Sequence, residues 1–428
     1  MPFENGVVGA VGDGMGLGGE TPLFCRYRFR YRPRRRWFRP IIGIAGTDVG
    51  TIDKRGTKGD HGNMEDANSY LALFFEPIRP YLQDDAVSEI LINGPNQIYI
   101  EQKGKLQATD ARFVSEPALK AAAVNVAKNV GRLLNDENPR LDARLPDGSR
   151  VHAVIPPLAR CGTVVAIRKF KKEKLTIGQL IEFGSITQPG AQLIDAIVKL
   201  HKNVIVSGAT SSGKTSVLNV LSAFIPDSER ILVIEDASEL QLQQRHTVCF
   251  ETRKPDKNGQ GEVTIRDLIH SSLRLRPDRL VIGEIRGGEA LDLLQALNTG
   301  HAGSMSTIHA NSPLDCLSRI ETCALLSGID IPLSALRAQV ASAIDVVVHT
   351  ARLSDGSRKV TAVSEVLGLE NGEYRTRDLY VYTIRGIAPD GSLDGGFAGT
   401  GAIPTFLHDA RLRGLPLDET TFAVAPDA

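Results

Sequence analysis

The octapeptide GATSSGKT, residues 208–215, combines the residue types that hold a polyphosphate. Its bounding glycines lack a Cβ, so the chain can wrap tightly with a series of backbone N–H groups pointing inward. Lys214 can reach the β- and γ-phosphates as a point charge, and the Thr215 hydroxyl can ligate Mg²⁺. The sequence therefore predicts a phosphate-binding loop (P-loop) for a nucleoside triphosphate, with these nucleotide-binding residues: Gly208, Ala209, Thr210, Ser211, Ser212, Gly213, Lys214, Thr215 and Ser216.

Hydrolysis also needs carboxylates at the ends of strands beside such a loop. Glu235 ends the apolar run RILVIE, and Glu284 ends the run RLVIGE. P-loop enzymes usually carry an aspartate on the metal side, and the extra methylene of Glu284 suits contact with Mg²⁺ through a water. The predicted metal-side residues are therefore Thr215 and Glu284. Either Glu235 or Glu284 could be the general base.

Histidine and arginine complete the candidate site. His309 ends a segment of small residues, SMSTIH, which would let it approach a ligand closely. No second ligand lies at metal-binding spacing from it, so a metal role is not indicated. Four arginines precede the P-loop region and could offset charge that develops on the γ-phosphate, or could form surface salt bridges: Arg144, Arg150, Arg160 and Arg168.

The elements that must position these residues follow from the hydrophobic pattern. From about residue 190 to 350, apolar β-branched runs alternate with amphipathic segments, which predicts a parallel sheet covered on both faces. Before it, strands around the Asn93–Asn96 turn and a helix with Ser115 as N-cap predict an α+β module. The predicted organisation is a basic arm, a first domain, a linker, an ATPase domain and a tail, over residues 1–63, 68–172, 173–189, 190–415 and 416–428.

Composition bounds the class of protein. The 428 residues carry 50 basic and 50 acidic side chains, so the net charge gives no indication of a nucleic-acid partner. The five scattered cysteines fit a reducing compartment, and Cys316 and Cys323 are expected to be small core residues. No apolar run approaches the ~20 residues that span a membrane, so we expect a cytoplasmic protein.

Eight arginines between Cys25 and Pro40 could bind phosphates or anionic headgroups. The alternative is a disordered tail, or residues upstream of the true start.

Several long motifs occur in order, and together they resemble the secretion ATPases of type II and type IV systems. The likeness runs from about Asn68 to the C-terminal helix and is greatest to the CpaF-like branch, which drives Tad-type pili and related conjugation machines. The strings that carry it are LINGPNQIYIE, LDARLPDGSRVHAVIPPLA, GATSSGKTSVLNVL, ILVIEDASELQL and LRLRPDRLVIGEIRGGEALDLLQALNTGHAGSMSTIHANSP.

The resemblance implies an α/β fold: a RecA-like P-loop NTPase domain preceded by a smaller α+β, PAS-like N-terminal domain. It makes GATSSGKT the Walker A loop, Glu235 the glutamate of the Asp box, Glu284 the end of Walker B, and His309 a γ-phosphate sensor. It selects Arg150 and Arg168 as the arginines that approach nucleotide. Members bind ATP and Mg²⁺ as homo-hexamers on the cytoplasmic face of the inner membrane, where they act on membrane platform proteins.

Two other functions are compatible with the residues. A DNA-dependent translocase would grip DNA with the arginine arm or a ring pore. A nucleotide-gated regulatory protein would bind nucleotide and turn it over very slowly.

Overall fold

The computed structural model describes residues 74–102, 104–170, 175–255, 259–389 and 391–424. All of them belong to one compact unit, residues 60–428. The basic arm predicted over residues 1–63 lies outside the described residues. Among those described, no helix combines the length and apolar character that crossing a membrane requires.

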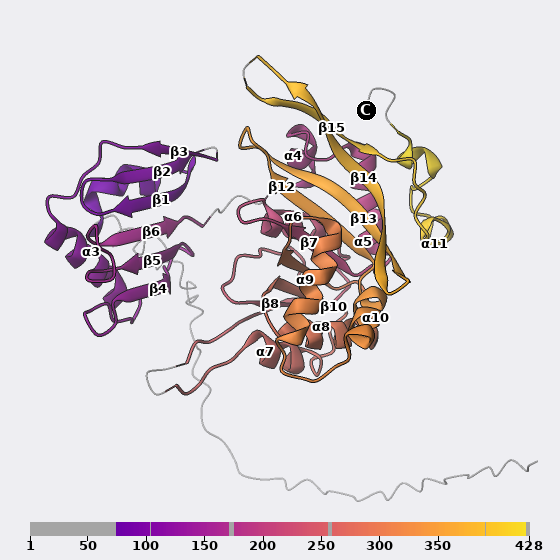
Figure 1. Cartoon of the computed structure of the whole chain (residues 1–428), viewed down its shortest axis with the longest axis horizontal. Helices are drawn as coiled ribbons and strands as arrows, with labels where there is room; N and C mark the ends of the chain where they lie inside the picture. Colours follow the sequence, from indigo (N-terminus) through magenta and orange to yellow (C-terminus); the bar gives the residue numbers. More distant parts are fainter. Residues whose placement is uncertain (1–73, 103, 171–174, 256–258, 390, 425–428) are drawn as a thin grey trace, which may run out of the picture. The chain divides into compact units, whose positions relative to one another are not determined.

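The first module is a six-stranded antiparallel sheet with the order β3-β2-β1-β6-β5-β4 (Figure 1). The hairpin predicted around Asn93–Asn96 is confirmed, because Ile92 of β1 pairs with Ile98 of β2. The helix is confirmed as well, since the Ser115 hydroxyl accepts a hydrogen bond from the N–H of Ala118. The elements of this module are η1 (Glu76–Ile78), α2 (Arg79–Gln83), β1 (Val87–Asn93), β2 (Ile98–Gln102), β3 (Lys105–Ala108), α3 (Glu116–Asn129), β4 (Arg140–Arg144), β5 (Arg150–Val154) and β6 (Val164–Arg168).

The second module is built on a nine-stranded sheet with the order β15-β14-β13-β12-β7-β11-β10-β8-β9. Strands β7 to β12 run parallel to one another, whereas β13 to β15 continue the sheet as an antiparallel ribbon. The predicted parallel sheet is thus confirmed, with the ribbon appended at one edge. Its strands are β7 (Val204–Gly208), β8 (Ile231–Glu235), β9 (Thr247–Glu251), β10 (Arg279–Ile285), β11 (Met305–His309), β12 (Val346–Arg352), β13 (Arg358–Glu370), β14 (Glu373–Ile387) and β15 (Leu393–Gly399).

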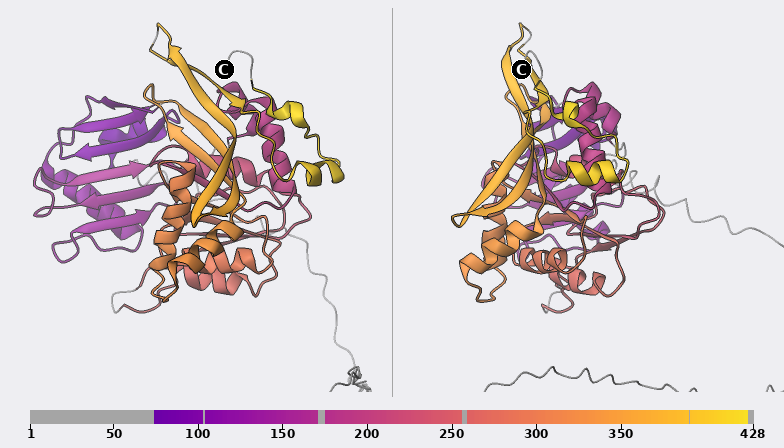
Figure 2. Two further views of the ribbon diagram at one scale, coloured as in Figure 1. Left: turned by 45° about the vertical axis from the view of Figure 1, so that its right-hand side comes forward. Right: turned by 90° about the vertical axis from the view of Figure 1, so that its right-hand side faces the viewer.

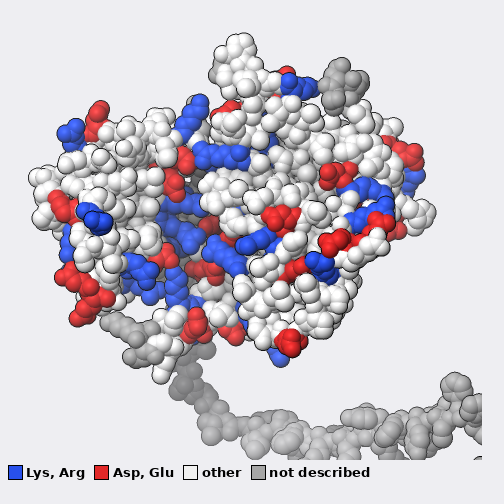
Figure 3. Space-filling view, in the orientation of Figure 1, with Lys and Arg blue, Asp and Glu red and all other residues white. Residues whose placement is uncertain are grey.

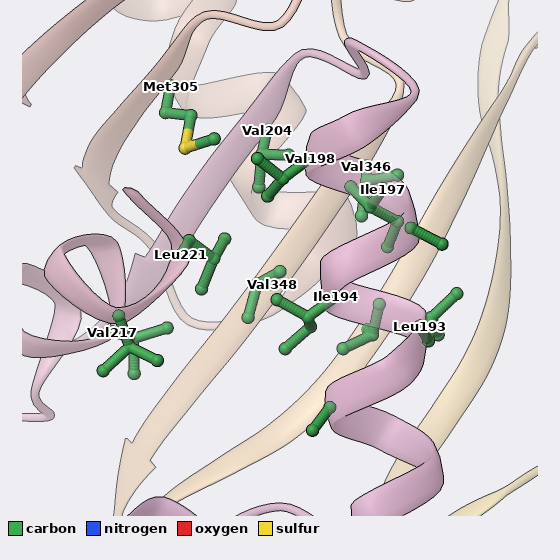
Figure 4. Packing of buried hydrophobic residues seen from close by; sticks show 14 of the residues in the cluster. Leu193, Ile194, Ile197, Val198, Val204, Val217, Leu221, Met305, Val346 and Val348 are labelled. Carbon is green, nitrogen blue, oxygen red and sulfur yellow. The ribbon is translucent and has the colours of Figure 1, made fainter. Parts of the chain in front are cut away.

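Helices cover both faces of this sheet, as predicted, because its central strands are apolar on both sides. On one face, Ile194 and Ile197 pack against Val204, Val346 and Val348 (Figure 4). On the other, four helices bury the second apolar cluster, which contains Cys316 and Cys323 as the sequence predicted. Figure 2 shows the two helical layers on opposite sides of the strands. The helices are α4 (Ile177–Glu182), α5 (Gln188–Lys199) and α6 (Lys214–Ser222), then α7 (Ile265–Ser272), α8 (Glu289–Asn298), α9 (Pro313–Leu325) and α10 (Leu333–Ala343), with α11 (Leu407–Leu412) and η2 (Glu419–Phe422) near the end.

The predicted linker and tail contain more structure than their composition suggested. Thr176 and Gln179 form a capping box that starts α4, and Leu180 is buried in the core of the second module. In the tail, Phe422 is fully buried and its ring lies 6.3 Å from that of Tyr380. The described residues of both ranges therefore pack against the second module, while the domain boundaries themselves remain a prediction.

Candidate nucleotide-hydrolysis site

The P-loop connects β7 to α6, in the strand–loop–helix context that the sequence predicted. Two residues of the loop adopt the left-handed backbone conformation: Ser211 has φ +60° and Gly213 has φ +99°. A Cβ on Gly208 would lie 2.5 Å from Oγ of Ser212 and 2.6 Å from Oγ1 of Thr350, so only glycine fits there. The loop therefore folds back on itself, and the N–H of Ser212 donates to the carbonyl of Ala209 at 3.4 Å.

Lys214 is the first residue of α6, and its side chain reaches back to the start of the loop. Its ammonium donates to the carbonyls of Gly208 at 3.2 Å and Ala209 at 3.1 Å. Its Nζ also lies 3.3 Å from Nδ1 of His309. Burial lowers the pKa of Lys214, while the carboxylate of Glu284 acts in the opposite direction. The charge of this lysine is therefore held next to where phosphate oxygens would bind.

His309 connects the lysine to Glu284. An ammonium can only donate, so Nδ1 of His309 accepts and carries no proton. Its Nε2 lies 2.7 Å from Oε1 of Glu284, although the two atoms are not aligned as a hydrogen bond. Burial, together with the charge of Lys214, lowers the pKa of His309. The imidazole is thus a neutral group between a cation and an anion.

Arg286, which the sequence reasoning missed, joins two of the acids. Its Nε donates to Oε2 of Glu284 at 2.8 Å, and its Nη1 lies 3.3 Å from Oδ2 of Asp236. The signal was present in EIRGGE, where an arginine follows the strand-end glutamate by two residues. Its partner Asp236 comes from a different strand end, so the pairing could not be found without the fold.

Glu235 is the other strand-end acid, and its surroundings differ from those of Glu284. Its side chain is buried, and Oε1 accepts from the N–H groups of Glu239 at 2.8 Å and Leu240 at 2.9 Å. Burial outweighs these two hydrogen bonds and raises the pKa of Glu235 to about 7. Gly283 lets it sit there, since a Cβ on Gly283 would come within 3.0 Å of Cγ of Glu235. A carboxyl with this pKa can exchange a proton at neutral pH.

One small pocket of about 40 Å³ brings four of the predicted residues together with Arg286. Its lining includes Arg150, Thr215, Glu235, Glu284 and Arg286. A cleft of about 820 Å³ shares Arg150 and Arg286 with it, and its size is that of an ordinary small-molecule site. Figure 3 shows basic side chains gathered in a hollow with acidic side chains beside them. The mixed charges suit a nucleotide that is bound by arginines and processed by carboxylates.

The two predicted arginines are placed differently. Arg150 lines the pocket, and its Nη1 lies 3.2 Å from Oε1 of Glu239. Arg168 lies opposite Arg150 in the register of β5 and β6, and it does not line the pocket. Its charge nevertheless contributes to lowering the pKa of Lys214. Of the other candidates, Arg144 pairs with Glu251 at 3.4 Å.

Comparisons with known proteins place the chain in a family. The family described as "Type II/IV secretion system protein" matches residues 74–378. A putative conjugal transfer protein of Mycobacterium tuberculosis is 35% identical over 320 residues, which cover 73% of this chain and 90% of that protein. The type IV secretion system protein VirB11 of Bartonella quintana is 31% identical over 324 residues, covering 67% and 90%.

Among solved structures, the VirB11 ATPase of the Brucella suis type IV secretion system, in complex with sulphate, is 26% identical over 70% of this chain and 95% of that chain. Its TM-score is 0.37. The sequence match to the family covers well over half of the chain. The chain therefore belongs to the type II/IV secretion system protein family.

Proposed function

We propose that this protein is a Mg²⁺-dependent ATPase that works as a homo-hexamer and drives pilus assembly or protein secretion. It would act on membrane platform proteins as a peripheral protein on the cytoplasmic face of the inner membrane, in the CpaF-like, Tad-type branch of the family. The observation that carries the proposal is the meeting of Lys214, His309, Glu284 and Glu235 at neighbouring strand ends around one P-loop. The enzyme is an ATP hydrolase.

The donor set fits a hard divalent cation. Thr215 and Glu284 line the same pocket and offer hydroxyl and carboxylate oxygen, the ligand type that Mg²⁺ prefers. Thr215 would hold the ion, and Glu284 would contact it through a water. When bound, Mg²⁺ neutralises charge on the β- and γ-phosphate oxygens.

Each remaining residue has a task that its position supports. The P-loop N–H groups bind and orient the phosphates, and Lys214 binds the β/γ oxygens. The Nδ1 of His309 and the ammonium of Lys214 hold each other in place, so the imidazole is oriented beside the γ-phosphate position. Arg150 offsets the charge that develops on the γ-phosphate in the transition state, and Arg168 adds positive charge next to it.

We assign the general base to Glu235. Its pKa of about 7 lets it take a proton from the attacking water at neutral pH. Glu284 is instead paired with Arg286 and lies against His309, contacts that suit a metal-side and positioning group.

The first experiment is a steady-state Mg-ATPase assay of the purified full chain, with its mass measured in the presence and absence of a non-hydrolysable ATP analogue. We expect slow hydrolysis and a sixfold assembly. Lys214→Ala should abolish turnover, while Lys120→Ala, which removes an exposed ion pair with Asp136, should not. Normal turnover in Lys214→Ala would refute the site, and a persistent monomer would refute the motor.

The alternative is a conjugation-type ATPase or DNA-dependent translocase, which the conjugal transfer protein of M. tuberculosis favours. The same ATPase assay separates the two functions when double-stranded DNA is added. Stimulation that disappears as salt is raised would support the translocase, because phosphate contacts release counterions. An unchanged rate would support the secretion motor.

A further inference from the structure

The β12–β13 hairpin contacts the P-loop from outside the motif. Strand β12 lies beside β7, with Thr350 opposite Gly208. The Thr350 hydroxyl donates to the carbonyl of Ser207 at 3.2 Å, which uses its only proton. The hydroxyl of Ser212, 2.8 Å away, must therefore be the donor to Thr350. Both side chains are buried, so this pair holds the loop without competition from water.

Arg358 holds the adjacent residue of the loop. Its Nε donates to the carbonyl of Ser211 at 2.8 Å. Its Cδ would lie 3.7 Å from a Cβ on Gly213, so the side chain runs along the outside of the loop. In a planar trans peptide the C=O and the following N–H point in opposite directions. Holding the Ser211 carbonyl therefore also fixes the orientation of the Ser212 N–H, which donates to the carbonyl of Ala209 at 3.4 Å.

The same arginine reaches a residue of the first module. Its Nη2 lies 3.2 Å from Oε1 of Glu101, a buried carboxylate on β2. Arg352, opposite Arg358 in the hairpin, donates from Nη2 to the carbonyl of Gly104. Glu101 and Gly104 flank the turn between β2 and β3. One guanidinium thus contacts a P-loop carbonyl and a buried acid more than a hundred residues before the P-loop.

We propose that Thr350 and Arg358 are positioning residues for the P-loop, and that Arg358 couples the state of the loop to the first module through Glu101. The inference rests on the proposed ATPase function, because it concerns the same P-loop. Thr350 fixes the side chain of Ser212, and Arg358 fixes the peptide between Ser211 and Ser212. If that peptide moves when phosphate binds, the hydrogen bond from Arg358 to the Ser211 carbonyl changes, and with it the contact of Arg358 with the Glu101 carboxylate.

The test compares full-length variants by MgATP dissociation constant, KM, kcat and thermal midpoint without nucleotide. Arg358→Gln and Thr350→Val should each raise the dissociation constant and KM on the order of tenfold, with a smaller change in kcat. Arg358→Lys should restore part of the affinity, because an ammonium can still donate to the Ser211 carbonyl. Arg375→Gln is the matched control, since Arg375 pairs with Glu370 on the same ribbon and contacts no P-loop residue.

Coupling is tested with Glu101→Gln and the double variant with Arg358→Gln. If the pair transmits the state of the loop, the effects on kcat/KM are non-additive and the double variant resembles Arg358→Gln alone. Additive effects would refute the coupling. Wild-type affinity in Arg358→Gln would refute the positioning role, and this variant is informative even if Thr350→Val does not fold, because the side chain of Arg358 is 39% exposed.

The two levels of the proposal fail separately. If the wild-type protein binds no MgATP, the proposed function fails and the positioning role fails with it. If the wild type binds MgATP, Lys214→Ala does not, and Arg358→Gln matches the wild type, then the ATPase stands and only the positioning inference is overturned.

Discussion

Nζ of Lys214 lies 3.3 Å from Nδ1 of His309, although the two residues are 95 positions apart in the chain. The contact exists because β7 and β11 are neighbours in the parallel sheet and end at the same edge, with His309 opposite Gly208. It makes the histidine a neutral acceptor whose other nitrogen faces Glu284. The predictions below follow from this arrangement and from the groups around it.

Replacing His309 with Gln should lower kcat by about a hundredfold, because a preoriented group beside the γ-phosphate is lost. The KM for ATP should change much less, since Lys214 and the loop N–H groups remain. Steady-state kinetics checks this, with His408→Gln on the exposed side of α11 as control. An unchanged kcat would remove His309 from the site.

The pH dependence of kcat should report Glu235. Its pKa is raised to about 7 by burial, so the carboxylate form that accepts a proton from water is depleted below that pH. We expect kcat to fall on the acid side of about pH 7 in the wild-type enzyme. In Glu235→Gln the residual rate should be low and should lack this limb. If instead Glu284→Gln removes the limb while Glu235→Gln keeps it, the assignment of the base is reversed.

The same carboxyl should affect stability. Its pKa is raised in the folded protein, so between about pH 4.5 and 7 the folded state binds more protons than the unfolded state. The stabilisation is fully present below pH 4.5 and is lost as the pH rises to about 7, by up to about 3 kcal/mol. Thermal midpoints measured from pH 4.5 to 8 should fall more steeply for the wild type than for Glu235→Gln. Parallel curves would contradict the raised pKa.

Gly208→Ala should weaken nucleotide binding. The added Cβ would lie 2.5 Å from Oγ of Ser212 and 2.6 Å from Oγ1 of Thr350, so the loop must shift. We expect MgATP affinity to fall by at least about tenfold, and the thermal midpoint to drop. Gly386→Ala is the matched control, because nothing lies within 4 Å of its added Cβ. Equal affinities in the two variants would show that the loop is adaptable.

Arg150→Gln should lower kcat by about a hundredfold or more while the dissociation constant of MgATP changes little, because the guanidinium acts on charge that develops in the transition state. Arg140→Gln, on the exposed end of the neighbouring strand β4, is the control. Single-turnover rates together with equilibrium binding separate the two effects. A loss of binding without a loss of kcat would make Arg150 a ground-state contact.

Most of the fold could be predicted because its signals are local. The runs that became β7, β8, β10 and β12 are apolar and β-branched over about one strand length, and helical patterns follow β7 and β10. The short β4 and β9 were missed, since their burial is partial and their residues mixed. Helix α4 was read as linker because its capping box is only one turn from charged and glycine-rich residues.

The sequence alone determined the P-loop, its lysine and hydroxyl, the strand-end acids and the family, since each depends on residues that are close together in the chain. Only the tertiary structure decided which distant groups meet them. Arg286 forms an ion pair with Asp236. Thr350 and Arg358 form hydrogen bonds with the P-loop, and burial raises the pKa of Glu235. Strand order, side-chain contact and desolvation arise from packing between segments far apart in the chain, and no local pattern encodes them.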